Sequence, residues 1–227
     1  MPTVLITGAN RGIGFEFARQ YADDGWRVIA TCRDPANAGE LSALGGDIEV
    51  HGLDVTDHVR IQALANSLKR SAIDLLLSNA GISGPRPNPF GGIDYQSWTE
   101  VLSVNAMSPL KLCECFVDHV ARSDFKRVIA VTSKMGSIAD NNSGGSYIYR
   151  SSKTALNAVM KSLSVELASR RVIVAMLHPG WVKTDMGGPG ALIEARTSVA
   201  GMRQVIAGLK LDDSGGFFNY DGAGIPW

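Results

Sequence analysis

Tyr149 and Lys153 are two side chains that can move protons, and they stand four residues apart. On a helix this spacing places both side chains on one face. A nearby ammonium favours the phenolate, so we expect Lys153 to lower the pKa of Tyr149. Tyr149 is then a candidate general acid or base, and Ser133 could donate a second hydrogen bond to the same substrate oxygen. The pair alone is weak support, because a solvated tyrosine and lysine at a helix start show the same spacing by chance.

The segments that must position these residues alternate between short apolar runs and amphipathic stretches. We predict strands at 3–7, 27–31, 48–53, 73–77, 128–132, 172–177 and 216–220. We predict helices at 15–23, 36–44, 57–70, 95–123, 149–169 and 191–209, with a kink at Pro109. This alternation predicts an α/β fold, a doubly wound parallel sheet of about seven strands with helices on both faces. The chain has no linker or internal repeat, so we expect residues 1–227 to form one domain.

A glycine-rich turn separates the first predicted strand from the first predicted helix. Such a turn lets backbone amides approach a pyrophosphate at a helix N-terminus. The glycine spacing differs from the commoner GxGxxG, and a tight strand-to-helix turn without a ligand is the alternative. Its place in the chain predicts a dinucleotide site with the candidate residues Gly8, Asn10, Arg11, Gly12, Ile13 and Gly14.

The residues after the second predicted strand indicate which nicotinamide cofactor binds. A cofactor without a 2′-phosphate normally meets an Asp or Glu near this point, which binds the ribose diol. Here Arg33 could bind a 2′-phosphate through both arms of its guanidinium, and Arg11 could approach from the other side. Asp34 favours NAD(H), although it lies one residue beyond the position from which an acidic side chain would bind the ribose diol. We therefore predict NADP(H), with NAD(H) as the alternative.

The composition argues against several classes of function. The chain has 22 Lys and Arg against 22 Asp and Glu, so no basic surface favours nucleic acid. No apolar run approaches the ~18 residues of a membrane span, and the strand at 3–7 leaves no room for a signal peptide. Cys32, Cys113 and Cys115 match no zinc spacing, and we expect no bound metal. These features predict a cytoplasmic protein.

Several short motifs follow one another along the chain. They are TGANRGIG at 7–14, Asp54-Val55, SNAG at 78–81, Asn105, Ser133, YRSSK at 149–153 and PGWVKT at 179–184. As an ordered set they resemble the short-chain dehydrogenase/reductase family over nearly the whole chain. The stretch 133–157, the segment PGWVKTDMGG and the ending DGAGIPW resemble its sniffer-like and C-factor-like carbonyl reductase branch.

The resemblance implies how the chain would hold its cofactor. Asp54 would bond the adenine edge, with Val55 beside the ring. The ribose side would be lined by Asn79, Ala80 and Gly81, and Lys153 would bond the nicotinamide ribose. The nicotinamide carboxamide would be held by Pro179, Gly180, Val182 and Thr184.

The resemblance also implies the chemical roles. Ser133 would position the substrate oxygen and Tyr149 would exchange its proton. Asn105 would hold the long helix open. It would also hold a water near Lys153, which completes a proton relay. Two features depart from the family pattern: Ser78 replaces the first Asn of NNAG, and sixteen residues lead from Ser133 to Tyr149. Only Tyr149 has a lysine four residues on, so we assign Tyr147 to the helix start or the pocket wall.

We predict NADPH-dependent reduction of an aldehyde, ketone or quinone to an alcohol. The alternatives are an NADP(H)-binding signalling protein with little turnover, and an alcohol dehydrogenase that works in the oxidative direction. The short glycine-rich segment 185–190 predicts an open pocket, and its apolar candidates could equally be ordinary packing: Phe90, Met135, Ile138, Tyr147, Trp181 and Met186. The resemblance also implies a homodimer or homotetramer, paired through the helices that start near Tyr95 and Tyr149.

Overall fold

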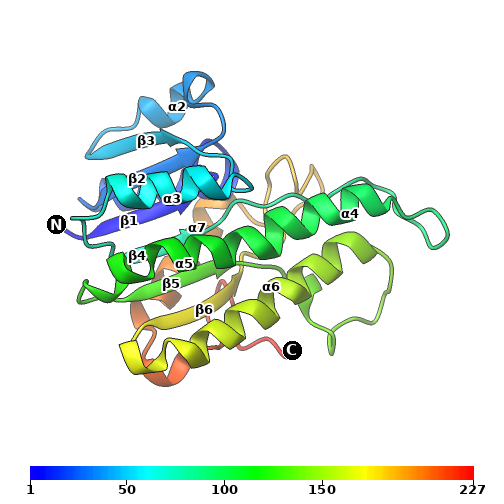
Figure 1. Ribbon diagram of the computed structural model, residues 1–227. Coiled ribbons are helices and arrows are strands. Elements are labelled where there is room, and N and C mark those ends of the chain that lie inside the picture. The colour runs from blue at the N-terminus through cyan, green and yellow to red at the C-terminus, as the bar shows by residue number, and fades with distance from the viewer.

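The computed structural model describes residues 1–227, and one parallel sheet of seven strands lies at its centre (Figure 1). The strand order is β3-β2-β1-β4-β5-β6-β7, and every neighbouring pair is parallel. The strands are β1 Thr3–Thr7, β2 Arg27–Cys32, β3 Ile48–Gly52, β4 Leu75–Ser78, β5 Arg127–Val131, β6 Ile173–His178 and β7 Phe217–Asn219. The predicted doubly wound sheet is confirmed, with the strand ends shifted by at most two residues.

Helices cover both faces of this sheet. One face carries α3 (His58–Ser67), α5 (Ser108–Ala121) and α6 (Tyr147–Glu166), whose buried side chains form one core cluster with the strands. The other face carries α1 (Gly12–Asp23), α2 (Gly39–Ser42) and α7 (Ala195–Gly208), which form a second cluster. Figure 1 shows α3, α5 and α6 in front of the sheet and α7 behind it. None of the helices combines the length and the apolar character that a membrane-spanning helix requires.

The central strands are mostly apolar because both of their faces are covered, whereas the edge strand β3 carries Glu49 and His51 and is only partly buried. In β1, Leu5 packs into the cluster of α3, α5 and α6, whereas Val4 and Ile6 pack into the cluster of α1 and α7. Successive side chains of a strand point to opposite faces, so a strand between two layers has no polar side. Ser133 comes two residues after the end of β5, at the edge of the sheet where the site lies.

The long predicted helix is not continuous. It consists of α4 (Tyr95–Leu102), a π-helical turn at Ser103–Met107, and α5. The irregularity in this helix is the π-helical turn that precedes Pro109, and Pro109 itself occupies the first turn of α5. Proline has no N–H, and a helix start is where this loss costs least.

Three predicted helices are shorter in the structure, and one of them, 57–70, is reduced to α3 at His58–Ser67. The stretch 36–44 forms only a 3₁₀ turn at Pro35–Asn37 and the four-residue α2, with Gly45 and Gly46 after it. Helix α7 begins at Ala195 and not near 191, because Ile193 pairs with Val182 in an isolated β-bridge. That bridge pairs two parts of the segment between β6 and α7 with each other.

Candidate active site

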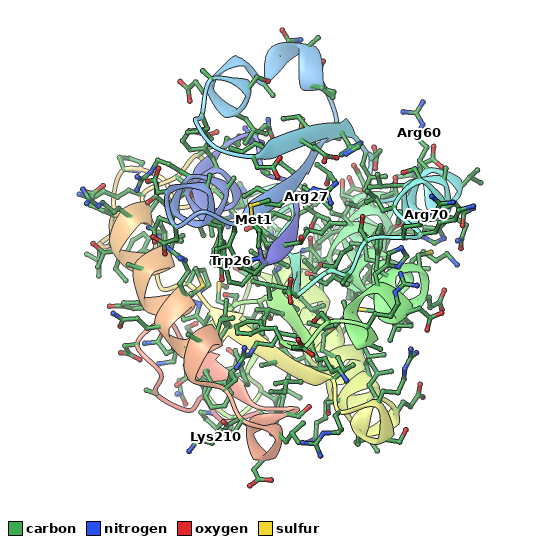
Figure 2. The ribbon with its side chains drawn as sticks, turned by 90° about the vertical axis from the view of Figure 1, so that its left-hand side faces the viewer. Met1, Trp26, Arg27, Arg60, Arg70 and Lys210 are labelled. Atoms are coloured by element: carbon green, nitrogen blue, oxygen red, sulfur yellow. The ribbon has the colours of Figure 1, made fainter.

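The site residues lie at the edge of the sheet where the strands end. Figure 2 views the opposite edge, where Met1 precedes β1 and Arg27 begins β2. In a doubly wound sheet, ligands bind beyond the carboxyl ends of the strands. Ser133 follows β5 by two residues, and Tyr149 and Lys153 lie in the first turns of α6. The fold therefore brings together three side chains that are separated along the chain.

Tyr149 is the candidate proton donor, and burial dominates its titration. Burial raises the pKa of Tyr149 above its ordinary value of 10.0, while a hydrogen bond with Ser133 and the positive charge of Arg86 act in the opposite direction. The expectation that the pKa of Tyr149 lies below its ordinary value is therefore wrong, because the net change is upward. The phenol remains protonated at neutral pH.

Lys153 lies on the same side of α6 as Tyr149, as their spacing predicts. Its Nζ is 5.9 Å from the centre of the Tyr149 ring and donates a hydrogen bond of 3.0 Å to the carbonyl oxygen of Val131. The side chain is only 5% exposed, and burial lowers the pKa of Lys153 from 10.5 to about 8. The direction of both shifts has one cause, since each side chain loses the water that would stabilise its charged form.

The turn that follows Ser133 packs its backbone directly against the backbone of α6, and this contact positions Ser133. Its Oγ accepts a hydrogen bond of 3.2 Å from the N–H of Met135, which starts a 3₁₀ turn at Lys134–Gly136. A Cβ atom on Gly136 would lie 2.9 Å from the carbonyl carbon of Lys153, so only glycine allows this approach. Thr154 Oγ1 donates a hydrogen bond of 3.0 Å to the Gly136 carbonyl. The turn after Ser133 and the helix of Tyr149 thus form one packed unit.

Asn105 lies in the π-helical turn and is 1% exposed. Its Nδ2 donates to the carbonyl of Ile82 (2.8 Å) and to Ser152 Oγ (3.0 Å), and its Oδ1 accepts from the N–H of Ile82 (2.9 Å). Ser152 Oγ in turn donates to the carbonyl of Tyr149 (2.8 Å). The hydrogen bonds of Asn105 therefore link the π-turn between α4 and α5 to the start of α6 and to the segment after β4. Its part in a proton relay with Lys153 stays a prediction.

The glycine turn is packed against the end of β4. Gly8 and Gly12 have left-handed φ angles of 67° and 57°, and a Cβ on Gly14 would lie 2.2 Å from the Gly8 carbonyl oxygen. Asn79 Nδ2 donates to the carbonyl oxygens of Thr7 (2.9 Å) and Gly8 (3.1 Å). Thr7 Oγ1 accepts from the N–H groups of Asn79 and Ala80, at 3.0 and 3.1 Å.

The start of α1 has the donors that a pyrophosphate needs. The residue before the helix is Arg11, whose side chain makes no capping hydrogen bond to the first backbone N–H groups. These groups have no carbonyl partner within the helix. Asn10 and Arg11 are exposed beside them, and Ile13 is half-buried. The turn fits a dinucleotide phosphate in conformation and in donor chemistry.

Asp34 is already used by the protein's own backbone. Its Oδ1 accepts from the N–H of Ala36 (3.1 Å) and its Oδ2 accepts from Asn37 Nδ2 (2.5 Å), so it caps the turn at Pro35–Asn37. Arg33 beside it is exposed. The counter-argument to NADP(H) that Asp34 supplies is therefore weakened, since both carboxylate oxygens have partners.

Asp54 and Val55 follow β3 but face different surroundings. Asp54 Oδ1 accepts from the N–H (2.9 Å) and the Oγ1 (2.7 Å) of Thr56. These two hydrogen bonds lower the pKa of Asp54, and the charge of Arg33 adds to the effect. Val55 is 7% exposed and belongs to the core cluster of α3 and α5. Arg33 and Asp54 thus lie at one end of the candidate cofactor site.

The segment after β6 touches the glycine turn from the other side. A Cβ on Gly12 would lie 3.3 Å from Thr184 Cγ2, and Arg11 forms an exposed ion pair of 2.8 Å with Asp185. Arg11 therefore points to Asp185 and not to the 2′-phosphate position that the sequence suggested for it. Ser198 of α7 donates a hydrogen bond of 2.6 Å to the Pro179 carbonyl, while Val182 is buried and Gly180 lies against Ile193 and Tyr220.

A family model described as short chain dehydrogenase matches residues 2–191. The chain belongs to the short-chain dehydrogenase family. It is 41% identical to C-signal of Myxococcus xanthus over 167 residues, which cover 74% of this chain and all of that protein. Among solved structures, the carbonyl reductase Sniffer of D. melanogaster superimposes with a TM-score of 0.93 at 33% identity, over all of both chains. An NADPH-bound carbonyl reductase from chicken fatty liver gives 0.92 at 35% identity, over 100% of this chain and 99% of that one.

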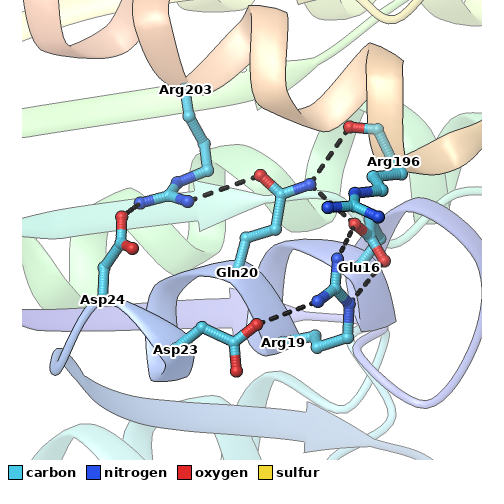
Figure 3. Close-up of polar contacts among 7 residues, drawn as sticks. All are labelled: Glu16, Arg19, Gln20, Asp23, Asp24, Arg196 and Arg203. Atoms are coloured by element: carbon cyan, nitrogen blue, oxygen red, sulfur yellow. Dashed lines mark hydrogen bonds and ion pairs between the residues drawn. The ribbon is translucent and has the colours of Figure 1, made fainter.

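In this short-chain dehydrogenase, a polar network between α1 and α7 was not predicted (Figure 3). Gln20 Nε2 donates to Glu16 Oε1 (2.6 Å) and to the carbonyl of Arg196 in α7 (3.1 Å). Arg203 of α7 donates to Gln20 Oε1 (3.4 Å) and pairs with Asp24. Glu16 and Gln20 stand four residues apart among apolar neighbours, and this is the signal in the sequence that could have revealed them. The network joins α1, which follows the glycine turn, to α7, which follows the segment that contains Thr184.

The apolar pocket candidates of the dehydrogenase are mostly at the surface. Phe90 is 90% exposed and its ring centre lies 6.5 Å from that of Tyr147, the first residue of α6. Tyr147 is therefore at the helix start, as expected. The others range from half-buried to exposed: Met135, Ile138, Trp181 and Met186. Arg86, whose charge reaches Tyr149, was missed by the sequence analysis, although it is an isolated arginine between two prolines.

Proposed function

We propose that this short-chain dehydrogenase is an NADPH-dependent carbonyl reductase. It converts an aldehyde, ketone or quinone to an alcohol. The observation that carries the proposal is the half-buried Tyr149, whose phenol Ser133 influences, with Lys153 on the same helix face. The likeness to two carbonyl reductases at TM-scores of 0.93 and 0.92 supports the same reaction class.

Each residue of the site has a distinct task in this reaction. When bound, NADPH supplies a hydride for the carbonyl carbon. Ser133 donates a hydrogen bond to the carbonyl oxygen, and Tyr149 gives its phenolic proton to the same oxygen, which leaves an alcohol. The raised pKa of Tyr149 suits a donor, because the proton is present at neutral pH. The cationic side chain of Lys153 stabilises the phenolate that remains.

The cofactor would be held at five places. The N–H groups at the start of α1, with Gly8 and Asn10 beside them, bind the pyrophosphate. Arg33 binds the 2′-phosphate, joined by Arg11 once it leaves Asp185. Asp54 and Val55 take the adenine, and Asn79, Ala80, Gly81 and Lys153 take the ribose side. The nicotinamide end lies against Pro179, Gly180, Val182 and Thr184. NAD(H) would lack the group that Arg33 recognises.

A signalling protein with little turnover is the second candidate. The 41% identity to C-signal favours it. A binding-only protein has no need for a protonated phenol beside a buried lysine, so the site itself argues for catalysis. An alcohol dehydrogenase would use the same residues in reverse, with Tyr149 as the base. We expect the cytoplasm as its compartment, and a homodimer or homotetramer paired through α4, α5 and α6, which light scattering would test.

The test is NADPH oxidation, followed by absorbance, with a panel of aldehydes, ketones and quinones. We expect turnover by the wild-type protein and none by Tyr149→Phe, which should still bind NADPH. Tight NADPH binding without turnover of any carbonyl or of the matching alcohols would favour the signalling protein. Full activity of Tyr149→Phe would contradict the assigned proton donor.

A further inference from the structure

Arg86 stands at the tip of a tight turn in the segment that follows β4. Pro85 and Pro87 flank it, and Asn88 Nδ2 donates a hydrogen bond of 3.2 Å to the carbonyl of Pro85, which closes the turn around Arg86. The proline rings restrict the backbone on both sides. The backbone at Arg86 is therefore held in place although its side chain is exposed.

The segment that carries this turn contacts the start of α6 on both sides of Arg86. On one side, both backbone groups of Ile82 bond to Asn105. A Cβ on Gly84 would lie 3.2 Å from Cγ2 of Ile148, the residue before Tyr149. On the other side, the Phe90 ring lies against Tyr147 at 6.5 Å. The segment thus passes over the start of α6, with Arg86 between its two points of attachment.

The guanidinium of Arg86 has no carboxylate partner. It takes part in none of the salt bridges of the chain. The acidic residues on the segments that border the site are already engaged. Asp140 pairs with Lys134 (3.3 Å), Asp185 pairs with Arg11 (2.8 Å), and Asp94 caps α4 through the N–H groups of Gln96 and Ser97. The mouth of the site therefore carries an unpaired positive charge, which also acts on the Tyr149 phenol.

We propose that Arg86 binds an anionic group of the substrate, such as a carboxylate, while exposed apolar side chains including Phe90 and Tyr147 contact the rest of the molecule. The preferred substrates are then carbonyl compounds with an apolar body and one negative charge. This inference rests on the proposed carbonyl reductase and names its substrate class. Arginine recognises a carboxylate through two parallel hydrogen bonds, and a charged hydrogen bond is stronger than a neutral one.

The test compares two aldehydes of the same skeleton, para-formylbenzoate and its methyl ester, with NADPH. We expect the wild-type protein to favour the carboxylate in kcat/KM, mainly through a lower KM. Arg86→Met should reduce the carboxylate-to-ester ratio by about ten-fold or more. Arg86→Lys should keep part of the preference. Arg70→Met is the matched control, because Arg70 lies before β4 at the opposite edge of the sheet (Figure 2), and this variant should keep the wild-type ratio.

The outcomes separate the two proposals. Turnover of both aldehydes with no preference for the carboxylate, or an equal fall of both in Arg86→Met, would overturn the role of Arg86 and leave the reductase standing. If neither aldehyde is reduced, the proposed reaction fails for this class. Arg86 is then judged by binding, as the rise in Tm that each aldehyde causes in the protein with saturating NADPH. A larger rise with the carboxylate that disappears in Arg86→Met supports the anion site, and equal rises contradict it.

Discussion

Pro109 follows Asn105 by four residues, so it cannot donate the α-helical hydrogen bond that the carbonyl of Asn105 would otherwise accept. The helix opens into a π-turn at Ser103–Met107, where the side chain of Asn105 reaches Ile82 and Ser152. π-turns of this kind are often found at functional sites. The position of Asn105 thus depends on a residue one turn further along the chain.

We predict that Pro109→Ala restores the α-helical bond and moves Asn105. The activity should fall by roughly ten- to a hundred-fold, since small displacements in an active site cost this much. The free energy of unfolding should stay the same or rise. The measurements are kcat and urea unfolding, with Pro2→Ala as the control, since Pro2 precedes the sheet. An unchanged kcat would show that Asn105 does not depend on the π-turn.

A second prediction concerns the contact between the turn of Ser133 and α6. Gly136→Ala would place a methyl 2.9 Å from the Lys153 carbonyl carbon and 3.1 Å from Asn157 Nδ2. Relief of this clash should displace Ser133 from Tyr149, lower kcat, and destabilise the protein by about 1 to 3 kcal/mol. Gly208→Ala in α7 is the matched control, because its methyl would meet no atom within 4 Å. Equal behaviour of the two variants would refute the packing argument.

A third prediction concerns the choice of cofactor. Arg33→Ala should raise the KM for NADPH by about ten-fold or more, through loss of a charged hydrogen bond, and change the KM for NADH little. Asp34→Ser keeps a capping oxygen and removes the carboxylate, so it should retain the preference for NADPH. Steady-state kinetics with both cofactors gives the answer. A wild-type protein that prefers NADH would rule out the role of Arg33.

A fourth prediction follows from the burial of Lys153. Its pKa of about 8 in the folded protein lies below the ordinary 10.5, so the unfolded chain binds more protons between these values. Burial of the ammonium therefore costs stability fully below pH 8, and the cost is relieved as the pH rises to 10.5. Lys153→Met should be inactive yet more stable than the wild type at pH 7, by about 3 kcal/mol. The difference should shrink at high pH in chemical unfolding; a constant difference would contradict the linkage.

The sequence was sufficient for the sheet and for placing Tyr149 and Lys153 on one face of a helix. A strand that is buried on both faces appears in the sequence as a continuous apolar run. Tyr149 and Lys153, four residues apart, both lie on α6 as their spacing predicts. The direction of the Tyr149 shift could not be predicted, because it depends on how much water the fold removes. Likewise, the capping role of Asp34 and the pairing of Arg11 with Asp185 depend on contacts that exist only after folding.

The proposed catalytic side chains and the candidate pocket side chains belong to parts of the chain that differ in their freedom to change. Ser133, Tyr149 and Lys153 lie on elements that share a core cluster with the sheet or pack directly on it. Arg86 and Phe90 lie on the segment 82–92, and Met186 lies on the segment 185–190, outside every strand and helix. Exchange of these two segments between relatives should therefore transfer substrate preference without rebuilding the proton-transfer machinery. Proteins that share this chemistry can therefore diverge in substrate preference through changes in these two loops alone.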